Sequence, residues 1–187
     1  MEKVIKTIDK NNKPRLLLHS CCGPCSSAIL ERINEYFDID VFYYNPNIDR
    51  AEEFYRRADE QVELVKNLGL EDEIEVRVID EFLNYIKGFE KYQEGGPRCF
   101  KCYRQRMEKS AEFATENNYD YFTTTLSISP HKDSQILNRL GDLLSKEYKV
   151  NYFFKKKNGF RRSVELTDKF NMYRQDYCGC EFSRRKD

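Results

Sequence analysis

The sequence contains no apolar run long enough to cross a membrane and no apolar stretch near its N-terminus. A membrane-spanning helix needs about 20 consecutive apolar residues, and the 40% of hydrophobic residues in this chain never form such a run. Residues 1–13 are a polar and charged extension, so we expect neither a signal peptide nor an anchor there. We therefore expect a cytoplasmic protein without membrane contact, in a compartment where thiols stay reduced.

Internal repeats and low-complexity tracts are also absent, and neither sign of charge dominates the chain. The length of 187 residues suits a single domain spanning residues 1–187. Residues 31–75 carry fourteen acidic and five basic side chains, whereas the segment 149–187 carries eleven basic and five acidic ones. A basic C-terminal segment on a neutral chain suggests an anionic partner such as nucleic acid, although a solvated surface would have the same composition.

Short apolar segments and amphipathic segments alternate along the chain. Apolar, β-branched and aromatic runs predict strands at residues 15–19, 39–44, 74–79, 119–125 and 150–154. Helical spacing of apolar side chains predicts helices at residues 26–37, 50–68, 102–117, 132–148 and 160–173. Residues 87–101 contain three glycines and a proline, which predicts that this segment is partly loop.

This order of elements predicts a single α/β domain with a Rossmann-like, mostly parallel five-stranded sheet flanked by helices and a cysteine-rich C-terminal tail. In such sheets the site lies outside the carboxyl ends of the strands. Cys21 and Cys22 follow the first strand, residues 45–47 follow the second, and residues 125–132 follow the fourth. We expect these three segments to meet at one crevice.

Three of the seven cysteines follow the first strand, in the sequence Cys21-Cys22-Gly23-Pro24-Cys25. A nucleotide-binding fold has its phosphate loop at this point, but here the loop offers thiols in place of a glycine-rich cradle. The free N–H groups and the dipole of the following helix stabilise thiolates. A single cysteine could be a small buried hydrophobe, whereas three within five residues favour metal binding or catalysis.

A Cys-x-x-Cys pair, Cys99 and Cys102, lies later in the chain. A thioredoxin-like dithiol normally follows the first strand, so a metal half-site fits this position better. Zinc often takes two Cys-x-x-Cys pairs, whereas the adjacent Cys21 and Cys22 could bind different irons of one cluster. The spacing therefore favours a [4Fe–4S] cluster over zinc.

The last two cysteines, Cys178 and Cys180, form a Cys-x-Cys pair near the C-terminus. A pair this close cannot easily hold two corners of a cluster, but it can close a strained disulfide that is readily reduced. We expect a redox-active pair. The alternative is a frayed tail with incidental thiols.

Other polar residues at the strand ends give weaker signals. His19 ends an apolar strand, where a hydrogen-bonded core histidine is commoner than a ligand. Residues 127–133 contain two serines, a histidine and a lysine that could bind substrate or phosphate. Asp133 could cap the next helix, donate a proton or offer an oxygen ligand to an extra iron.

Five segments form a set of motifs that runs in order along nearly the whole chain. They are Leu18-His19-Ser20-Cys21-Cys22-Gly23-Pro24-Cys25, Tyr44-Asn45-Pro46-Asn47-Ile48, Arg98-Cys99-Phe100-Lys101-Cys102-Tyr103 with Arg106, Thr124-Thr125-Leu126 with Ser129-Pro130-His131-Lys132, and Tyr173-Arg174-Gln175-Asp176-Tyr177-Cys178-Gly179-Cys180. Each motif alone is ambiguous. Together they resemble the QueH-type epoxyqueuosine reductases, which work without cobalamin, and they keep that family's cysteine pattern.

The resemblance implies a fold similar to the HUP class, a [4Fe–4S] cluster and a redox-active cysteine pair. The positions that match the cluster ligands are Cys21, Cys22, Cys99 and Cys102. The positions that match the redox pair are Cys178 and Cys180. Cys25 has no firm counterpart, so a structural role and a role as ligand to an auxiliary iron both stay open.

The implied reaction removes the epoxide oxygen of epoxyqueuosine in the tRNA anticodon loop, as the last step of queuosine synthesis. Two electrons and two protons are consumed, and water and a double bond result. An iron with an open coordination site would polarise the epoxide oxygen, and His131 or Asp133 would protonate it. The expected contacts to RNA phosphates are Lys155, Lys156, Lys157, Arg161 and Arg162.

Two other functions fit parts of the pattern. A PP-loop-like iron–sulfur enzyme that transfers sulfur to tRNA would share the fold, but the first loop lacks a glycine- and serine-rich pyrophosphate cradle. A zinc-stabilised RNA-binding module would use the cysteines and basic residues without catalysis. Tight ATP binding would favour the first alternative, and zinc without iron or sulfide would favour the second.

Overall fold

A parallel five-stranded sheet forms the centre of the molecule, with strand order β3-β2-β1-β4-β5. The computed structural model describes residues 2–81, 87–130, 132–153 and 159–184. The strands are β1 (Arg15–His19), β2 (Asp38–Tyr44), β3 (Val76–Ile79), β4 (Tyr121–Thr124) and β5 (Asn151–Tyr152). All four pairings between neighbouring strands are parallel. The chain adds β2 and β3 on one side of β1, and then β4 and β5 on the other side, so the direction in which strands are added changes between β1 and β4.

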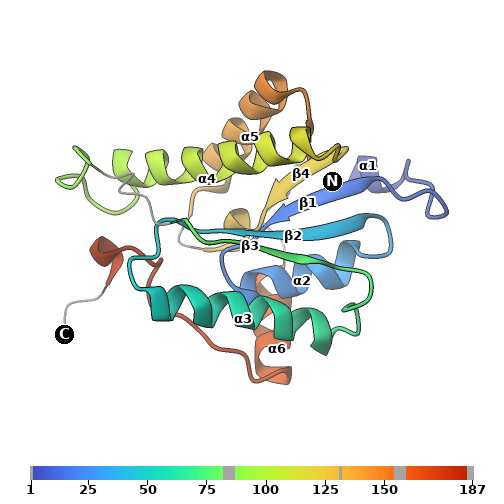
Figure 1. Ribbon diagram of the computed structural model, residues 1–187, viewed down its shortest axis with the longest axis horizontal. Coiled ribbons are helices and arrows are strands. Elements are labelled where there is room, and N and C mark those ends of the chain that lie inside the picture. The colour runs from blue at the N-terminus through green and yellow to red at the C-terminus, as the bar shows by residue number, and fades with distance from the viewer. Residues whose placement is uncertain (1, 82–86, 131, 154–158, 185–187) are drawn as a thin grey trace.

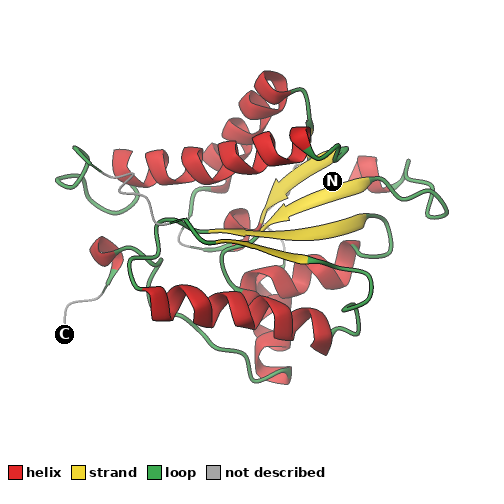
Figure 2. Ribbon diagram, in the orientation of Figure 1, coloured by secondary structure: helices red, strands yellow, loops and turns green. Residues whose placement is uncertain are grey.

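Helices cover both faces of this sheet. They are α1 (Glu2–Ile5), α2 (Gly23–Ile33), α3 (Ala51–Asn67), α4 (Pro97–Glu116), α5 (Ser134–Tyr148) and α6 (Phe160–Lys169), with short 3-10 turns η1 (Thr125–Ile128) and η2 (Glu181–Ser183). Helices α4 and α5 lie on one face, and α2, α3 and α6 lie on the other (Figure 1). Figure 2 shows the same three layers by element type. The predicted α/β fold with its parallel five-stranded sheet is confirmed. None of the helices in the described ranges combines the length and apolar character that crossing a membrane requires.

The position of β1 at the centre of the sheet explains why its sequence is a continuous apolar run. Side chains of a strand alternate between the two faces of the sheet. Leu16 and Leu18 pack into the core beneath α2 and α3, whereas Leu17 packs into the core beneath α4 and α5. All three leucines are fully buried. A strand covered on both faces needs apolar side chains at every position, which is typical of parallel sheets.

Two helix starts differ from the prediction and change where cysteines lie. Helix α4 begins at Pro97 and not at residue 102, because proline suits the first turn of a helix. Cys99 is therefore on the helix, as Cys102 is, and not in the preceding loop. Helix α2 begins at Gly23 and not at residue 26, again with a proline in its first turn. Cys25 is therefore a helical residue.

The other predicted limits are mostly close, except that α2 ends at Ile33 and not at residue 37, and α6 also ends four residues early. Helix α6 ends at Lys169, so residues 170–173 belong to the connection that leads to the tail. Strand β5 comprises only Asn151 and Tyr152, and residue 154 of the predicted strand lies outside the described residues.

Candidate active site

Segments after three neighbouring strands meet at the carboxyl end of the sheet. Asn45, after β2, donates its Nδ2 to the carbonyl of Ser20, after β1, at 2.9 Å. The backbone N–H of Cys21 points to Thr125 Oγ1 in η1 at 3.4 Å. Since β1 lies between β2 and β4, its carboxyl end receives one contact from each side. The predicted meeting of these segments is found, and it lies at the topological switch point of the sheet.

Three thiols cluster where β1 passes into α2, and we call Cys21, Cys22 and Cys25 the N-terminal trio. Their sulfur atoms all lie within 4.8 Å of one another, and those of Cys21 and Cys22 are 3.7 Å apart. Tetrahedral metal–thiolate bonds of about 2.3 Å place two sulfurs about 3.8 Å apart. Cys21 and Cys22 are buried, and Cys25 is half-buried. The spacing of the trio is therefore compatible with a bound metal ion.

The thiols of the trio differ in acidity because they hydrogen-bond to one another. Hydrogen bonding from Cys22, and then from Cys25, holds the pKa of the Cys21 thiol well below its usual value, although burial opposes the shift. The same bonds to Cys21 raise the pKa of Cys22 and of Cys25. The start of α2 at Gly23 adds unpaired helix N–H groups beside the trio. Cys21 is thus the most readily ionised thiol of the three.

The Cys-x-x-Cys pair lies on the first turns of α4. The backbone N–H of Gly95 donates to Cys99 Sγ at 3.2 Å. One helical turn beyond Cys102, Arg106 directs its Nη1 at the Cys102 sulfur from 3.7 Å. Burial raises the pKa of the Cys99 thiol, with a further contribution from the charge of Cys178. The α4 pair and the C-terminal cysteines line one small hollow, so they are near neighbours.

The C-terminal cysteines, Cys178 and Cys180, form the tail pair, and side chains from other segments hold its backbone. Arg57 of α3 donates to the carbonyl of Tyr177 at 3.2 Å and to that of Cys178 at 3.5 Å. Asn47, after β2, also donates to the Cys178 carbonyl, at 3.2 Å. The tail is thus attached to the end of β2 and the start of α3.

The glycine between the two tail cysteines is required by its surroundings. Gly179 has a φ of +117°, and a Cβ at this position would lie 2.8 Å from Ile48 Cγ1. Its carbonyl accepts the backbone N–H of Asp49 at 3.0 Å. Only glycine allows this backbone conformation and this close approach. All seven cysteines lie in the described ranges, and all are free thiols.

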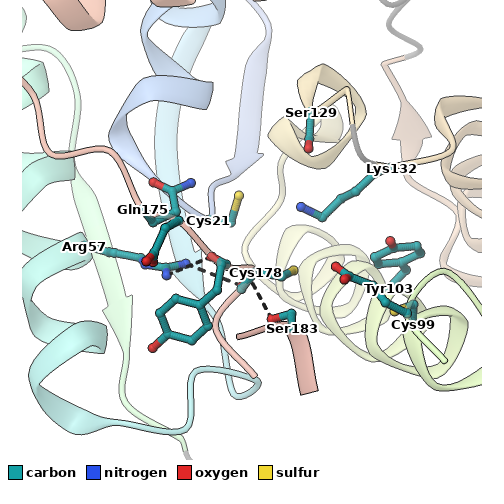
Figure 3. Close-up of a pocket in the computed structure, with 12 residues that line it drawn as sticks. Cys21, Arg57, Cys99, Tyr103, Ser129, Lys132, Gln175, Cys178 and Ser183 are labelled. Atoms are coloured by element: carbon teal, nitrogen blue, oxygen red, sulfur yellow. Dashed lines mark hydrogen bonds between the residues drawn. The ribbon is translucent and has the colours of Figure 1, made fainter. Parts of the chain in front are cut away.

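A cavity of about 240 Å³ opens between the trio, α4 and the tail (Figure 3). Cysteines from three distant segments line it, namely Cys21, Cys99 and Cys178. A smaller hollow of about 20 Å³ shares Cys99 and Cys178 with it, and is also lined by Cys102 and Cys180. The cavity therefore connects all three cysteine segments.

Two cations face this group of thiols. Arg106 is 1% exposed, and its Nη2 donates to Asn45 Oδ1 at 2.8 Å, while its Nε is buried without a hydrogen-bond partner in the described part of the chain. Burial would lower the pKa of Arg106, but thiolate charge at Cys102 and Cys21 raises it. Lys132 points its ammonium into the cavity (Figure 3), and thiolate charge at Cys178 and Cys21 raises its pKa against the effect of burial. The site is therefore built to stabilise negative charge on sulfur.

His19 behaves as the predicted core histidine. Its Nδ1 lies 2.8 Å from Thr124 Oγ1, and its Nε2 lies 3.1 Å from the carbonyl of Tyr44. Burial, aided by the charge of Arg106, lowers the pKa of this imidazole to about 3. The ring is therefore neutral, and both nitrogens have a partner.

Of the two residues expected to donate a proton, only Asp133 lies within the described residues. Asp133 is exposed and caps α5, because its Oδ1 accepts the backbone N–H of Gln135 at 2.8 Å and that of Ile136 at 3.3 Å. It does not line the cavity. His131 lies outside the described residues. Their neighbours Ser129 and Lys132 do line the cavity.

The predicted RNA contacts are only partly described. Lys155, Lys156 and Lys157 lie outside the described residues. Arg161 and Arg162 begin α6, and both pair with carboxylates: Arg161 with Glu165 at 3.2 Å, and Arg162 with Glu31 at 2.6 Å. An RNA phosphate would have to compete with these carboxylates.

Some residues of the site were not identified by sequence reasoning. Arg57 lies on an amphipathic helix, where its charge suggested solvent exposure, yet it is 2% exposed and contacts the tail. Tyr103 and Ser183 line both cavities. Tyr103 follows the Cys-x-x-Cys pair directly, and this position next to cysteines was the available signal.

Comparison with known proteins gives concordant results. A family model described as epoxyqueuosine reductase QueH matches residues 16–186. The "Epoxyqueuosine reductase QueH" of Streptococcus pyogenes serotype M1 is 37% identical over 99% of this chain and 76% of its own length. The protein of the same name from Thermotoga maritima is 30% identical over 90% of this chain and 89% of its own length.

A solved structure also has a similar fold. It is described as the U34-tRNA thiolase NcsA from Methanococcus maripaludis with its [4Fe–4S] cluster. The TM-score is 0.56, with 16% sequence identity over 98% of this chain and 67% of the other. At this identity the likeness establishes the fold alone.

Proposed function

The chain belongs to the QueH family of epoxyqueuosine reductases, oxidoreductases of the final step in queuosine biosynthesis, and we propose how its cavity performs that step. We infer that the substrate is epoxyqueuosine in the anticodon loop of tRNA and that the reduction depends on a [4Fe–4S] cluster. The observation that carries the proposal is the convergence of thiols from three chain segments on one cavity. Because these thiols must stay reduced, we assign the enzyme to the cytoplasm.

Four thiols are assigned to the cluster: Cys21, Cys22, Cys99 and Cys102. Cysteine thiolates are the usual ligands of iron–sulfur clusters. Positive charge on the buried Arg106 and the half-buried Lys132 suits such an anionic centre. The thiolase of similar fold is described with a [4Fe–4S] cluster, which supports the assignment. When bound, the cluster would supply one-electron transfer and a Lewis-acidic iron.

Cys25 is assigned to an additional iron ion beside the cluster. Its sulfur lies within 4.8 Å of those of Cys21 and Cys22, which is close enough for one ion to contact more than one of the three. A purely structural role is the alternative, and the iron content of a Cys25 variant distinguishes the two.

The tail pair is assigned as the source of the two electrons. Oxidation of two thiols to a disulfide releases two electrons and two protons. Loss of the epoxide oxygen as water, with formation of a double bond, consumes the same number of each. Cys178 and Cys180 line the smaller hollow together with Cys99, so they lie beside the assigned cluster ligands. An external dithiol reductant would return the pair to the thiol state.

A proton must also reach the departing oxygen. His131 and Asp133 remain candidates, but Asp133 already accepts two hydrogen bonds as the cap of α5. Lys132 lies between them in the sequence and directs its ammonium into the cavity. Because thiolate charge raises the pKa of Lys132, its ammonium keeps its proton. We therefore assign Lys132 to hydrogen-bond the departing oxygen, with Ser129 as a neighbouring hydrogen-bonding group, and leave proton donation to His131 or Asp133.

The proposed substrate must leave the stack of the anticodon loop, which single-stranded RNA permits at low cost. A cavity of about 240 Å³ suits one modified base and not several nucleotides. The rest of the loop would then lie on the protein surface. Lys155, Lys156 and Lys157 remain proposed phosphate contacts, together with Arg161 and Arg162.

The proposal is tested by anaerobic purification, metal and sulfide analysis, and turnover of tRNA that carries epoxyqueuosine. We expect iron and sulfide, broad absorption near about 400 nm, and a product that has lost the mass of one oxygen atom. Zinc without iron or sulfide would refute the cluster. An unchanged tRNA mass in the presence of a loaded, reduced enzyme would refute the reaction.

A further inference from the structure

The segment that leads into the Cys-x-x-Cys pair is rich in aromatic and basic residues. We call residues 87–104 the cavity rim. Within it lie four aromatic and five basic side chains but only two acidic ones. Three of its residues, Glu94, Cys99 and Tyr103, line both the main cavity and the adjoining hollow. The rim is therefore one of the described surfaces that border the cavity, together with residues of the tail.

Aromatic rings run from the surface of the rim to the cavity wall. Phe100 is 39% exposed, and its ring centroid lies 6.5 Å from that of the buried Tyr103, which lines the cavity. Tyr92 is 36% exposed, and its ring lies 5.7 Å from that of Phe89. Single exposed aromatic residues are common on proteins, but these two exposed rings belong to one segment, and Phe100 contacts a residue of the cavity wall.

Two lysines of the rim lie over aromatic rings. Lys101 Nζ is 4.5 Å from the ring centroid of Phe89, and Lys91 Nζ is 5.5 Å from that of Tyr92. In the described part of the chain, neither lysine forms an ion pair with a carboxylate. Their charges are therefore available to an anionic partner, in contrast to those of Arg161 and Arg162.

The rim is also held in place before any partner arrives. Arg98 is 4% exposed, and its Nη1 donates to the carbonyls of Glu90, at 3.1 Å, and Tyr92. Its guanidinium lies 4.3 Å from the ring centroid of Phe182 in the tail. One buried side chain thus connects the loop before α4, the helix itself and the tail. Such preorganisation lowers the cost of ordering a binding surface.

We propose that the cavity rim binds the nucleotides that flank the reacting base, with Phe100 and Tyr92 stacking on bases and Lys91 and Lys101 contacting phosphates. This inference rests on the proposed tRNA substrate. Proteins bind single-stranded RNA by stacking bases on aromatic side chains beside basic residues. Loss of one stacked base is expected to weaken binding about tenfold, or about 1.4 kcal/mol.

The absence of tryptophan from the chain provides a direct test. Phe100→Trp introduces a single indole at the rim, and Phe160→Trp places one beside the competing arginines of α6. Leu143→Trp, on α5 at a side chain that is 63% exposed, is the matched control. An RNA hairpin with the sequence of the anticodon stem and loop is titrated into each full-length variant, and indole fluorescence is recorded.

We expect saturable quenching for Phe100→Trp and none for Leu143→Trp. Quenching of Phe160→Trp alone would overturn the inference and would favour the α6 surface. No quenching at either position, under conditions where the wild-type enzyme turns over its tRNA, would also overturn it. If the wild type has no activity on tRNA but the hairpin quenches Phe100→Trp, the proposed reaction fails while the stacking surface stands.

Kinetics provide a second, independent measurement. Phe100→Ala should raise the KM for tRNA about tenfold with little change in kcat, since a stacked neighbour positions the RNA without reacting. Leu143→Ala should change neither constant. Because Cys99 and Cys102 lie near Phe100, iron content is measured for each variant. A fall in kcat at full iron content, with KM unchanged, would contradict the inference.

Discussion

The N-terminal trio and the tail pair present thiols in two different ways. The trio follows the central strand of the sheet and enters a helix, with Cys21 and Cys22 buried and the three sulfurs within 4.8 Å of one another. The tail pair belongs to no long element, and both of its thiols are half-buried. Side chains from distant segments hold its backbone through carbonyl groups.

This difference matches the two kinds of chemistry that we propose for the two groups. A metal centre needs ligands whose positions hardly change, and a central strand with a helix N-terminus provides them. A thiol pair that is oxidised and regenerated must be reached by its reductant, which a half-buried tail allows. In the α4 pair, Cys99 borders both the cavity and the smaller hollow, and Cys102 borders the smaller hollow.

The largest expected effect comes from removing a proposed cluster ligand. Cys99→Ser should lose bound iron and activity together. Activity should fall by more than about a hundredfold, because even groups behind metal ligands typically contribute ten- to a hundredfold. Iron and sulfide analysis with single-turnover assays measures both. The matched variant Cys25→Ser should lose part of its iron and keep the cluster absorption. A Cys99→Ser protein with full iron content would contradict the assigned ligand set.

Removal of a tail thiol should separate binding of the cluster from the redox cycling of the tail pair. Cys178→Ser should keep the cluster absorption and iron content but lose sustained turnover with a dithiol reductant, since the pair can no longer cycle. The absorption spectrum and a progress curve with excess tRNA measure this. If Cys178→Ser loses its iron, the tail pair belongs to the metal centre, and the distinction between the two groups is wrong.

A smaller effect is expected from the buried cation between the cysteine segments. Arg106→Met removes the charge that faces Cys102 and the hydrogen bond to Asn45, so the protein should retain metal about ten- to a hundredfold less tightly. Arg106→Lys keeps the charge and should be affected less. Iron retention during dialysis against a chelator measures the difference. Equal retention in all three proteins would show that Arg106 does not stabilise the centre.

The smallest of these effects concerns how the tail is held. Arg57→Gln removes the bonds to the carbonyls of Tyr177 and Cys178 and leaves Glu53 without its ion-pair partner. The free energy of unfolding should fall by about 3 kcal/mol, and alkylation of Cys178 should become faster. Thermal unfolding and mass-resolved alkylation measure the two effects.

An exposed ion pair on the same helix serves as the control for Arg57→Gln. Lys66 pairs with Glu63 at 2.7 Å on the solvent side of α3. Lys66→Ala should leave the stability and the alkylation rate nearly unchanged, because exposed ion pairs contribute little. Similar results for the two variants would mean that Arg57 is not what holds the tail.

Local sequence signals were sufficient to predict the strands of the sheet and the position of the cysteine segment that follows β1. The predicted strand at residues 15–19 has the limits of β1, because three leucines between a proline and a serine leave little choice. The start of α4 was placed too late, since Pro97 was interpreted as part of a loop although proline favours a first helical turn. Glycines directly before it made the loop interpretation natural.

The parts that were missed depend on contacts between residues far apart in the chain. Arg57 lies on a helix rich in charge, and its burial depends on the Tyr177 carbonyl, 120 residues away. Arg106 belongs to one of the motifs in the sequence, but its role was not predicted, because its partner Asn45 is 61 residues away. A helical periodicity identifies an apolar face, but it does not reveal which charged residue a distant segment will cover.

The central claim, that the metal centre and the tail pair have separate tasks, is tested most directly by a single turnover without external reductant. Anaerobic, prereduced enzyme is mixed with excess tRNA that carries epoxyqueuosine, and the oxidised thiols are located by mass spectrometry. The account predicts about one queuosine per enzyme and a disulfide between Cys178 and Cys180, as a two-electron couple requires, with iron content unchanged. Product formation that leaves both tail thiols reduced would contradict it.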